Sequence, residues 1–277
     1  MALNRDREVS AEQVWHSYMT TGKVPEGVHL EWFESKLFRP FVRAIPSDPR
    51  CRVCYFPFHG IGGMFSRALL GLVPSKMNPQ LCNVCERFAE RHQGGTELEL
   101  SLLFADVRGS TSLAEGMSPT AFSSLIDRFY QVTTSILFRR YAFIEKLIGD
   151  EVTGFFVPGF AGPNHARVAI EAGREILEAT GHGRPGGPWI PIGVGVHTGL
   201  AFVGAIGAGA GTTDIAVLGD NVNTAARLAS QAGIGELLVS RDAIHASGIE
   251  FPSLEIRHLE LKGRAQPIEA GVISPGG

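Results

Sequence analysis

The amino-acid sequence predicts an α+β fold, because short apolar strands alternate with amphipathic helices over most of the chain. Ahead of this alternating region stands a shorter stretch that holds all 4 cysteines of the chain, in two close pairs. The sequence therefore predicts a larger α+β domain behind a small helical and cysteine-containing module. The expected boundaries are a helical arm over 1–45, a four-cysteine metal-binding module over 46–95 and the main domain over 96–277.

Composition excludes several classes of protein. A length of 277 residues with 44% hydrophobic content is enough for one substantial domain and a smaller one. The formal net charge of -3 provides no overall basic surface for nucleic acid. No apolar run reaches the roughly 18 residues of a membrane span, and the N-terminus lacks the apolar core of a signal peptide. We therefore expect a cytoplasmic protein that binds neither nucleic acid nor membranes.

The first 45 residues are expected to be mostly helical from residue 9 onward. Ser10 followed by Gln13 is a possible capping box, which marks a helix start. Trp15, Tyr18 and Met19 follow at helical spacing. A second short helix is expected over 31–42. The favoured interpretation is an arm packed on the neighbouring domain, since nothing specific in the pattern supports a partner-binding helix.

The four cysteines form two CxxC pairs, Cys51 with Cys54 and Cys82 with Cys85, separated by 27 residues. In a chain without a secretory signal, this pattern indicates a metal site more than disulfides. Each pair supplies two thiolates, and two pairs complete a tetrahedral S₄ site. The glycine-rich loop between the pairs shows little regular pattern, as expected of a module stabilised by metal. Structural zinc is favoured; an iron–sulfur cluster, and free or redox-active thiols, remain alternatives.

The remaining elements follow in order along the chain. A short polar helix is expected over 86–97, with a stop and domain boundary at Gly94-Gly95. A strand over 102–105 precedes a helix that Ser118-Pro119 opens. The later elements are a hairpin over 143–157, a helix over 164–180, a loop over 181–188, strands over 190–197 and 201–206, a flexible tip over 207–211, a helix after Gly219, and strands over 237–239 and 256–261. The order strand–helix–strand–strand–helix–strand is that of a ferredoxin-like core.

Three motifs carry candidate chemistry, and the first is the stretch 102–111. An apolar strand ends at Asp106, and a Gly109-Ser110-Thr111 turn follows. A carboxylate at a strand end is a possible metal ligand, and the turn's successive amides can face an anion. By itself such an aspartate is more often a capping or turn residue.

The second motif is the hairpin that turns at Gly149-Asp150. Turns of this type between apolar runs are a strong hairpin signal. Lys146 alternates with apolar neighbours, so it is expected to project from the hairpin face. The chain thus offers two carboxylates at strand ends, Asp106 and Asp150, and two such ligands with phosphate oxygens commonly hold Mg²⁺ in nucleotide enzymes.

The third motif is the stretch 218–230, in which Asn223 and Arg227 are four residues apart and share one helix face. Together and in this order, the three motifs resemble the catalytic domain of class III nucleotidyl cyclases, the adenylate and guanylate cyclase family. The resemblance covers roughly 97–273, and this family has a ferredoxin-like fold.

The resemblance implies a role for each motif residue. Asp106, with Val107 beside it, and Asp150 would bind two divalent ions, Mg²⁺ or Mn²⁺. Asn223 would orient the ribose, and Arg227 would stabilise the α-phosphate in the transition state, for which a planar guanidinium is well suited. Lys262 matches the family's late lysine for the terminal phosphates, although Arg264 is an equally reachable cation. The turn that would hold the β- and γ-phosphates consists of Val107, Arg108, Gly109, Ser110 and Thr111.

The choice of base depends on two positions. Lys146 stands where adenylate cyclases of this family have a lysine and guanylate cyclases a glutamate, which favours ATP. The second position, three residues before Gly219, is usually Asp or Thr in the family but is Ala216 here. Alanine makes no side-chain hydrogen bond, so this departure puts the strength of base discrimination in doubt. Asp214 is a possible substitute if the loop alignment is shifted.

The resemblance also implies a homodimer, because this family builds its active site from two catalytic domains and this chain carries both sets of residues. The expected activity is that of an adenylate cyclase, which converts ATP to 3′,5′-cyclic AMP and pyrophosphate. Two alternatives remain: a cyclase of another nucleotide such as GTP, and a catalytically silent module that responds to metal or redox state.

Overall fold

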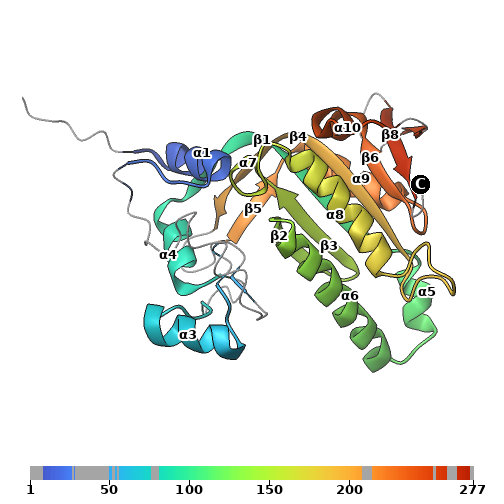
Figure 1. Ribbon diagram of the computed structural model, residues 1–277, viewed down its shortest axis with the longest axis horizontal. Coiled ribbons are helices and arrows are strands. Elements are labelled where there is room, and N and C mark those ends of the chain that lie inside the picture. Colours follow the sequence, from blue (N-terminus) through green and yellow to red (C-terminus); the bar gives the residue numbers. More distant parts are fainter. Residues whose placement is uncertain are drawn as a thin grey trace, which may run out of the picture. The chain divides into compact units, whose positions relative to one another are not determined.

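The computed structural model describes residues 9–26, 28, 50–51, 54, 56–75, 81–207, 214–251, 254–260 and 267–274. The expected helix over 31–42, most of the tip over 207–211, and Lys262 and Arg264 lie outside these residues. The chain divides into two compact units (Figure 1). One comprises 1–97 with 202–217, and the other comprises 98–201 with 218–277.

The second unit contains the predicted ferredoxin-like core. Its first four strands are β1 (Gly94–Val107, which begins in the first unit), β2 (Phe143–Ile148), β3 (Glu151–Phe156) and β4 (Ile192–Ile206, which ends in the first unit). They lie in the order β2-β3-β1-β4, and β3 is antiparallel to both β1 and β2. Helices α6 (Pro119–Arg139) and α8 (His165–Ala179) make the two crossovers. This is the order and pairing of a ferredoxin-like sheet, which confirms the predicted fold.

Helices α6 and α8 contact each other and lie side by side against the sheet (Figure 1). The Ser118 hydroxyl accepts a hydrogen bond from the Ala121 amide at 3.2 Å, and Pro119 occupies the first turn, so α6 begins where the sequence predicted. The buried faces of both helices join one apolar core with the strands. Its large members include Leu103, Phe129, Leu137, Phe156, Ile170 and Ile176.

The sheet of the second unit extends beyond the four-strand core. Strands β6 (Leu237–Ser240), β8 (Ile268–Ile273) and β7 (Glu255–Leu259) follow β4 in that order, and α10 (Arg241–Ser247) packs against this extension. The short helices α5 (Ser110–Glu115) and α7 (Pro158–Ala161), and α9 (Asp220–Gln231), complete the unit. The sequence did not predict α5, α7, α10 or β8.

Strand β4 corrects one prediction, because it is a single strand over Ile192–Ile206 where two strands were expected. The break was expected between residues 197 and 201. In the structure a Cβ atom on Gly199 would lie 2.7 Å from the Asn221 side chain, so the glycine permits a close approach and does not end the strand.

The first unit contains α1 (Ala11–Thr21), α3 (Gly60–Leu70), α4 (Asn83–Arg91) and β5 (Asp214–Leu218, which ends in the second unit); β5 pairs with β4. The predicted capping box of Ser10 and Gln13 is present. Trp15, Tyr18 and Met19 are buried as expected, and the Trp15 indole donates a hydrogen bond to the His92 carbonyl oxygen at 2.6 Å. Helix α1 is therefore packed on the end of α4.

Two predictions in the cysteine module were wrong. The glycine-rich stretch between the cysteine pairs contains a regular helix, α3. Its apolar residues do recur at helical spacing, but Gly60, Gly62 and Gly63 disfavour a helix locally, so the stretch resembled a loop. The next helix, α4, runs over Asn83–Arg91 and not over 86–97, and Gly94 and Gly95 begin β1. Among the described residues, no helix has the length and apolar character needed to cross a membrane.

Candidate functional site

The carboxylates of the first two motifs lie at adjoining strand ends. Asp106 stands opposite Glu151 in the register of β1 and β3. The Val107 amide donates a hydrogen bond to the Asp150 carbonyl oxygen at 3.1 Å, which places Asp150 beside the end of β1. The Tyr130 hydroxyl of α6 donates to the Gly149 carbonyl oxygen at 2.7 Å and so fixes the hairpin turn. Sheet register and helix packing together bring the two carboxylates into one region.

Arg108 is the cation of this region. Its guanidinium forms an ion pair with the Asp106 carboxylate and donates to the Ser230 carbonyl oxygen at 2.8 Å. Burial lowers the pKa of Arg108, an effect that the negative charges of Asp150 and Glu151 oppose. Burial also raises the pKa of Glu151, and the nearby Asp150 charge adds to that shift.

The donor set suits a divalent cation. Asp106 and Asp150 present hard oxygen ligands, which is the chemistry that Mg²⁺ and Mn²⁺ take in proteins. A cation at this place would also offset the mutual repulsion of the acidic groups, which a single guanidinium balances only in part. The residues present therefore fit a divalent ion.

The turn after β1 leads into α5. Gly109 adopts φ 66°, the left-handed conformation that glycine reaches without strain, and it caps α5. The Val107 and Arg108 amides are engaged, since Arg108 donates to the Pro191 carbonyl oxygen at 2.8 Å. The first-turn amides of Ser110 and Thr111 have no acceptor within the helix, as at any helix start. An anion at this turn would therefore meet the amides from residue 109 onward.

Helix α9 carries Asn223 and Arg227 on one face. Asn223 is exposed and Arg227 is half-buried. The contact between Arg108 and Ser230 joins the end of β1 to the last turn of α9. Asn223 stands seven residues earlier, about 10 Å along the helix axis at 1.5 Å per residue.

The start of α9 is held by side chains that sequence reasoning missed. His197 of β4 is buried, and its two ring nitrogens lie 2.8 Å from Ser240 Oγ and 2.8 Å from Asn221 Oδ1. Asn221 also donates to the Leu200 carbonyl oxygen at 2.7 Å. The only signal in the sequence was a histidine within an apolar strand, which by itself indicates a satisfied core residue.

The two positions predicted to select the base, 146 and 216, belong to different units. Lys146 belongs to β2, where its backbone pairs with Thr153. Ala216 is half-buried in β5, and Asp214 accepts a hydrogen bond from the Ile215 amide at 2.9 Å. Of the cations predicted to contact the phosphates, Arg227 lies in the described part of the chain, and Lys262 lies outside it.

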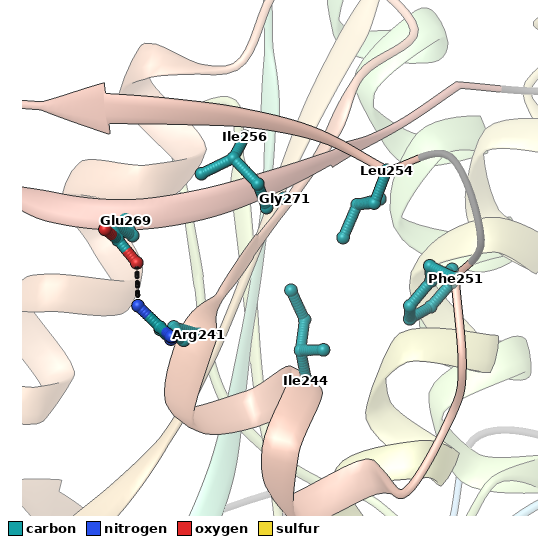
Figure 2. Close-up of a pocket in the computed structure, with 7 residues that line it drawn as sticks. All are labelled: Arg241, Ile244, Phe251, Leu254, Ile256, Glu269 and Gly271. Atoms are coloured by element: carbon teal, nitrogen blue, oxygen red, sulfur yellow. Dashed lines mark hydrogen bonds and ion pairs between the residues drawn. The ribbon is translucent and has the colours of Figure 1, made fainter.

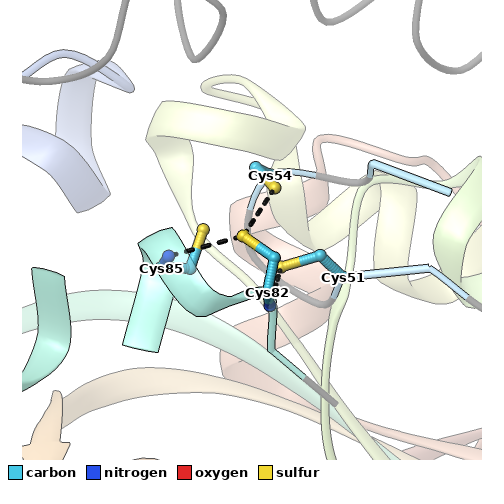
Figure 3. A group of neighbouring side chains, drawn as sticks. All are labelled: Cys51, Cys54, Cys82 and Cys85. Atoms are coloured by element: carbon cyan, nitrogen blue, oxygen red, sulfur yellow. Dashed lines mark hydrogen bonds between the residues drawn. The ribbon is translucent and has the colours of Figure 1, made fainter. Parts of the chain in front are cut away.

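The four cysteines come together as predicted (Figure 3). All are buried, none is in a disulfide, and their Sγ atoms lie within 4.8 Å of one another. The Cys54 and Cys82 Sγ atoms are 3.6 Å apart. The Cys82 amide lies 3.2 Å from the Cys51 sulfur and the Cys85 amide 3.4 Å from the Cys82 sulfur, so backbone donors stabilise thiolate charge there.

The cluster fits one tetrahedral metal ion. Four sulfur atoms at about 2.3 Å from a common centre lie about 3.8 Å apart, close to the spacing observed. Burial, followed by the neighbouring sulfurs, raises the pKa of the Cys54 thiol. Burial also opposes ionisation of Cys51, but hydrogen bonds from the other thiols outweigh it and lower the Cys51 pKa. Four buried sulfurs this close cannot all ionise without a cation, so their protons and a metal ion compete for the site.

A separate cavity of about 530 Å³ lies between α10 and strands β7 and β8 (Figure 2). The Arg241 and Glu269 side chains form an ion pair at its edge. Its apolar wall consists of Ile244, Phe251, Leu254 and Ile256. None of the predicted site residues contributes to the described lining.

Comparison with known proteins relates this arrangement to one family. The family described as "Adenylate and Guanylate cyclase catalytic domain" matches residues 95–271. The adenylate cyclase of Anabaena cylindrica is 28% identical over 178 residues, which cover 61% of this chain and 35% of that protein. An uncharacterized protein of Mycobacterium tuberculosis is 29% identical over 187 residues, or 65% of this chain and 34% of that protein. The chain thus spans about a third of the length of these relatives.

Solved structures give the same relationship. The adenylyl cyclase CyaB from P. aeruginosa is similar with a TM-score of 0.55 and 26% identity, over 65% of this chain and 96% of that one. The guanylyl cyclase Cya2 has a TM-score of 0.58 and 24% identity, over 66% of this chain and 96% of that one. At 24% identity, the similarity to Cya2 is evidence for a shared fold alone.

Proposed function

The chain belongs to the adenylate and guanylate cyclase catalytic-domain family, and from this premise we propose that it is an adenylate cyclase. The reaction is attack of the ribose 3′-hydroxyl of ATP on the α-phosphate, which yields 3′,5′-cyclic AMP and releases pyrophosphate. The observation that carries the proposal is the meeting of Asp106 and Asp150 at adjoining strand ends, linked by the hydrogen bond from the Val107 amide to the Asp150 carbonyl oxygen at 3.1 Å.

In this proposal Asp106 and Asp150 hold two Mg²⁺ or Mn²⁺ ions. Divalent ions bound there lower the pKa of the attacking hydroxyl and offset charge on the phosphates. Arg108 orients the Asp106 carboxylate through their ion pair until the substrate arrives. The role predicted for the turn is narrower than the sequence suggested: the amides of Gly109, Ser110 and Thr111 face the β- and γ-phosphates, because those of Val107 and Arg108 are engaged.

The cationic and ribose-binding residues come from α9 and the late loop. Asn223 orients the ribose, and Arg227 stabilises the charge that develops on the α-phosphate oxygens. Lys262 is assigned to the terminal phosphates on the family resemblance alone. His197 and Asn221 act through α9, because they fix the turn from which Asn223 projects.

ATP is favoured over GTP by Lys146, which stands at the family's base-selecting position. Adenylate cyclases are among the relatives, and so are guanylyl cyclases. Ala216 makes no side-chain hydrogen bond to a base, so we expect the preference for ATP to be weaker than two polar contacts would give.

The complete site requires two copies of the chain. The family builds each site from two catalytic domains, and this chain carries the aspartates of one half and the α9 residues of the other. We therefore propose a homodimer with two equivalent sites related by two-fold symmetry.

The cysteine cluster is proposed to hold zinc as a structural ion. The sulfur spacing supports a single central ion over an iron–sulfur cluster, since thiolates on different irons are separated by the inorganic core and lie farther apart. In this interpretation the metal stabilises the first unit and takes no part in the reaction.

The test is an assay of the purified chain with Mn²⁺ and each of ATP, GTP, CTP and UTP, with products separated by chromatography. The proposal expects cyclic AMP as the main product. Cyclic GMP as the main product would change the proposed base from adenine to guanine but would still support a cyclase. No cyclic product from any triphosphate, in protein that is folded and dimeric, would favour the silent module. Metal analysis and an absorption spectrum of the same sample distinguish colourless zinc protein from a coloured iron–sulfur protein.

A further inference from the structure

Helix α3 presents an apolar face to solvent. The exposed fractions are 85% for Ile61, 73% for Met64, 57% for Phe65 and 65% for Leu69. Of the other large apolar side chains exposed among the described residues, Leu200 and Ile206 share β4 but stand six residues apart, and Tyr141, Leu218, Ile234 and Ile256 stand singly. Scattered apolar residues are normal on a protein surface, whereas a contiguous face on one helix indicates a contact surface.

The spacing of these residues is that of a helix–helix seam. Ile61, Met64, Phe65, Ala68 and Leu69 recur three and four residues apart, and all five are exposed on α3. Such a stripe packs against another helix. Ala68 is the small member, and a small residue within a seam lets two helices approach closely. None of these five side chains is charged. The face is therefore complementary to another apolar helix face and not to a charged surface.

The area is sufficient for two copies of the face. A large aromatic side chain has an accessible surface of about 150–250 Å². The four large side chains of this face are each more than half exposed, so together they present on the order of 500 Å² of apolar surface. Two such faces together would remove roughly 1,000 Å² from water, the lower end of a specific interface. A second copy of this chain supplies an identical face, as a two-fold contact requires.

Helix α3 is held at both of its ends. At its start, a Cβ atom on Gly63 would lie 2.4 Å from the carbonyl carbon of Phe58, the residue before the N-cap, so the first turn lies close against the chain that leads into it. At its end, Asn83, which stands between Cys82 and Cys85, donates from Nδ2 to the Gly71 carbonyl oxygen at 3.2 Å. Asn83 Oδ1 accepts from the Val73 amide at 3.3 Å. The orientation of α3 is therefore tied to the second cysteine pair.

We propose that the apolar face of α3 is a self-association surface, which packs on the same face of a second copy of the chain across a two-fold axis. The contact belongs to the cysteine module and does not depend on the cyclase assignment. In this arrangement we place the two-fold axis close to Ala68, the small residue at which two helices can approach most closely, so that each copy of this residue faces the other.

Cross-linking through an introduced cysteine tests this geometry directly. In the full chain, Ala68→Cys places an exposed thiol near the axis, while the four native cysteines are buried. Mild oxidation should give a disulfide-linked dimer on a non-reducing gel. Glu178→Cys, an exposed position on α8, is the matched control for random collision, and it should cross-link far less at the same concentration.

A second substitution in the Ala68→Cys background shows whether the face itself makes the contact. Phe65→Glu should reduce the cross-linked fraction by about tenfold or more, because it would bury an unpaired carboxylate in an apolar seam. Arg67→Glu, an equally exposed change on the same helix but beside the face, should leave the cross-link nearly unchanged. Because both side chains are exposed, neither substitution should prevent folding, which circular dichroism checks.

Two results would overturn the proposal: cross-linking of Ala68→Cys no greater than that of Glu178→Cys, or cross-linking unaffected by Phe65→Glu. A different result would assign the face to a lipid surface. In that case Ala68→Cys would fail to cross-link, and the protein would sediment with phosphatidylcholine–phosphatidylglycerol vesicles unless it carried Phe65→Glu. The assay requires no nucleotide and no turnover, so its failure is distinct from loss of cyclase activity, which is measured separately on the same samples.

Discussion

Asp106 is held by two constraints of different origin. Strand register fixes its backbone opposite Glu151, and the Arg108 guanidinium fixes its carboxylate. Acidic side chains gather beside it, and burial, with the Asp150 charge adding to the effect, raises the pKa of the half-buried Glu151. The chemistry that we propose therefore depends first on single carboxylates, which can be tested one at a time.

Asp106→Asn and Asp150→Asn should each lower Mn²⁺-dependent turnover of ATP by at least about 100-fold, since each removes a charged metal ligand. Asparagine keeps the shape of the side chain, so thermal unfolding should change little. Steady-state rates and circular dichroism melts measure both effects, with the exposed Asp242→Asn as the control. If both variants kept more than a small fraction of the wild-type rate, the two-metal assignment would be wrong.

The buried histidines predict a loss of stability in acid. Burial lowers the pKa values of His165 and His182. Below the ordinary histidine pKa of about 6.5 the unfolded chain binds protons that the folded chain does not, so the free energy of unfolding falls as the pH drops from 6.5 toward the lowered pKa. The slope is at most about 1.4 kcal/mol per pH unit for each histidine.

Urea unfolding at several pH values between 5 and 8 measures this slope. His165 Nδ1 lies 2.8 Å from Ser101 Oγ, which also lies 2.7 Å from Thr198 Oγ1. His165→Gln retains a polar group in that network and removes the titration, so its stability should depend less on pH. A wild-type curve that is flat between pH 5 and 7 would contradict the assignment of a neutral buried His165.

At the scale of elements, α9 depends on residues outside itself. Its N-cap residue is Gly219, which has no side chain to cap the helix. The start of the helix is instead held to β4 by hydrogen bonds that involve Asn221 and His197. This tie matters for function, because Asn223 and Arg227 can act on a nucleotide only if α9 holds a fixed position.

Asn221→Ala should therefore destabilise the protein by about 1–3 kcal/mol, the cost of leaving the buried His197 nitrogen and the Leu200 carbonyl without their partner. Hydrogen exchange of the amides in the first turns of α9 should accelerate more than exchange in α8. Asn221→Asp, which keeps the acceptor for His197, should restore part of the stability. Uniform acceleration over the whole second unit would contradict a local role for Asn221.

The cysteine module is the second element-scale case. Cys82→Ser, or removal of the metal by a chelator, should abolish metal binding and accelerate hydrogen exchange in α3 and α4, because binding free energy at such a site is also folding free energy. Exchange in β1 beyond residue 98 and in α6 should stay unchanged. The measurement pairs metal content with peptide-resolved exchange, and a metal-free protein with unchanged exchange in α3 and α4 would show that the metal does not stabilise the module.

At the scale of the whole molecule, the proposed homodimer makes a prediction by complementation. Asp106→Ala and Arg227→Ala should each be inactive alone. In a mixed dimer, one of the two sites contains both substitutions. The second site takes its aspartates from the Arg227→Ala chain and its arginine from the Asp106→Ala chain, so all of its residues are wild type. About half of randomly mixed dimers are of this kind, each with one working site of two, so activity should recover to roughly a quarter of wild type.

The control for this experiment is proof that mixed dimers form, by differently tagged chains that co-purify after mixing. With that proof in hand, an absence of recovered activity would mean that the two sets of residues do not meet across the dimer.

The sequence alone determined the features that depend on neighbouring residues. The Ser10 and Gln13 capping box, the start of α6 at Ser118-Pro119, and the turn at Gly149-Asp150 were all predictable, because caps and tight turns are formed by residues within a few positions of one another. The alternation of apolar strands and helices gave the ferredoxin-like order for the same reason. The CxxC spacing likewise predicted the cysteine cluster, since each pair is local.

Tertiary structure decided what depends on residues far apart in the chain. The Arg108 guanidinium reaches the Ser230 carbonyl oxygen, 122 positions away, only because the end of β1 and the last turn of α9 lie together. The network of His197, Asn221 and Ser240 likewise joins three elements. The exposure of the α3 face is also a tertiary property, because the helical spacing of its apolar residues predicts a stripe but not whether that stripe is buried. Local sequence pattern determines which helices and strands form. Burial, and the charges of neighbouring side chains, arise only when distant elements pack together, and these two factors set the electrostatics of the candidate site.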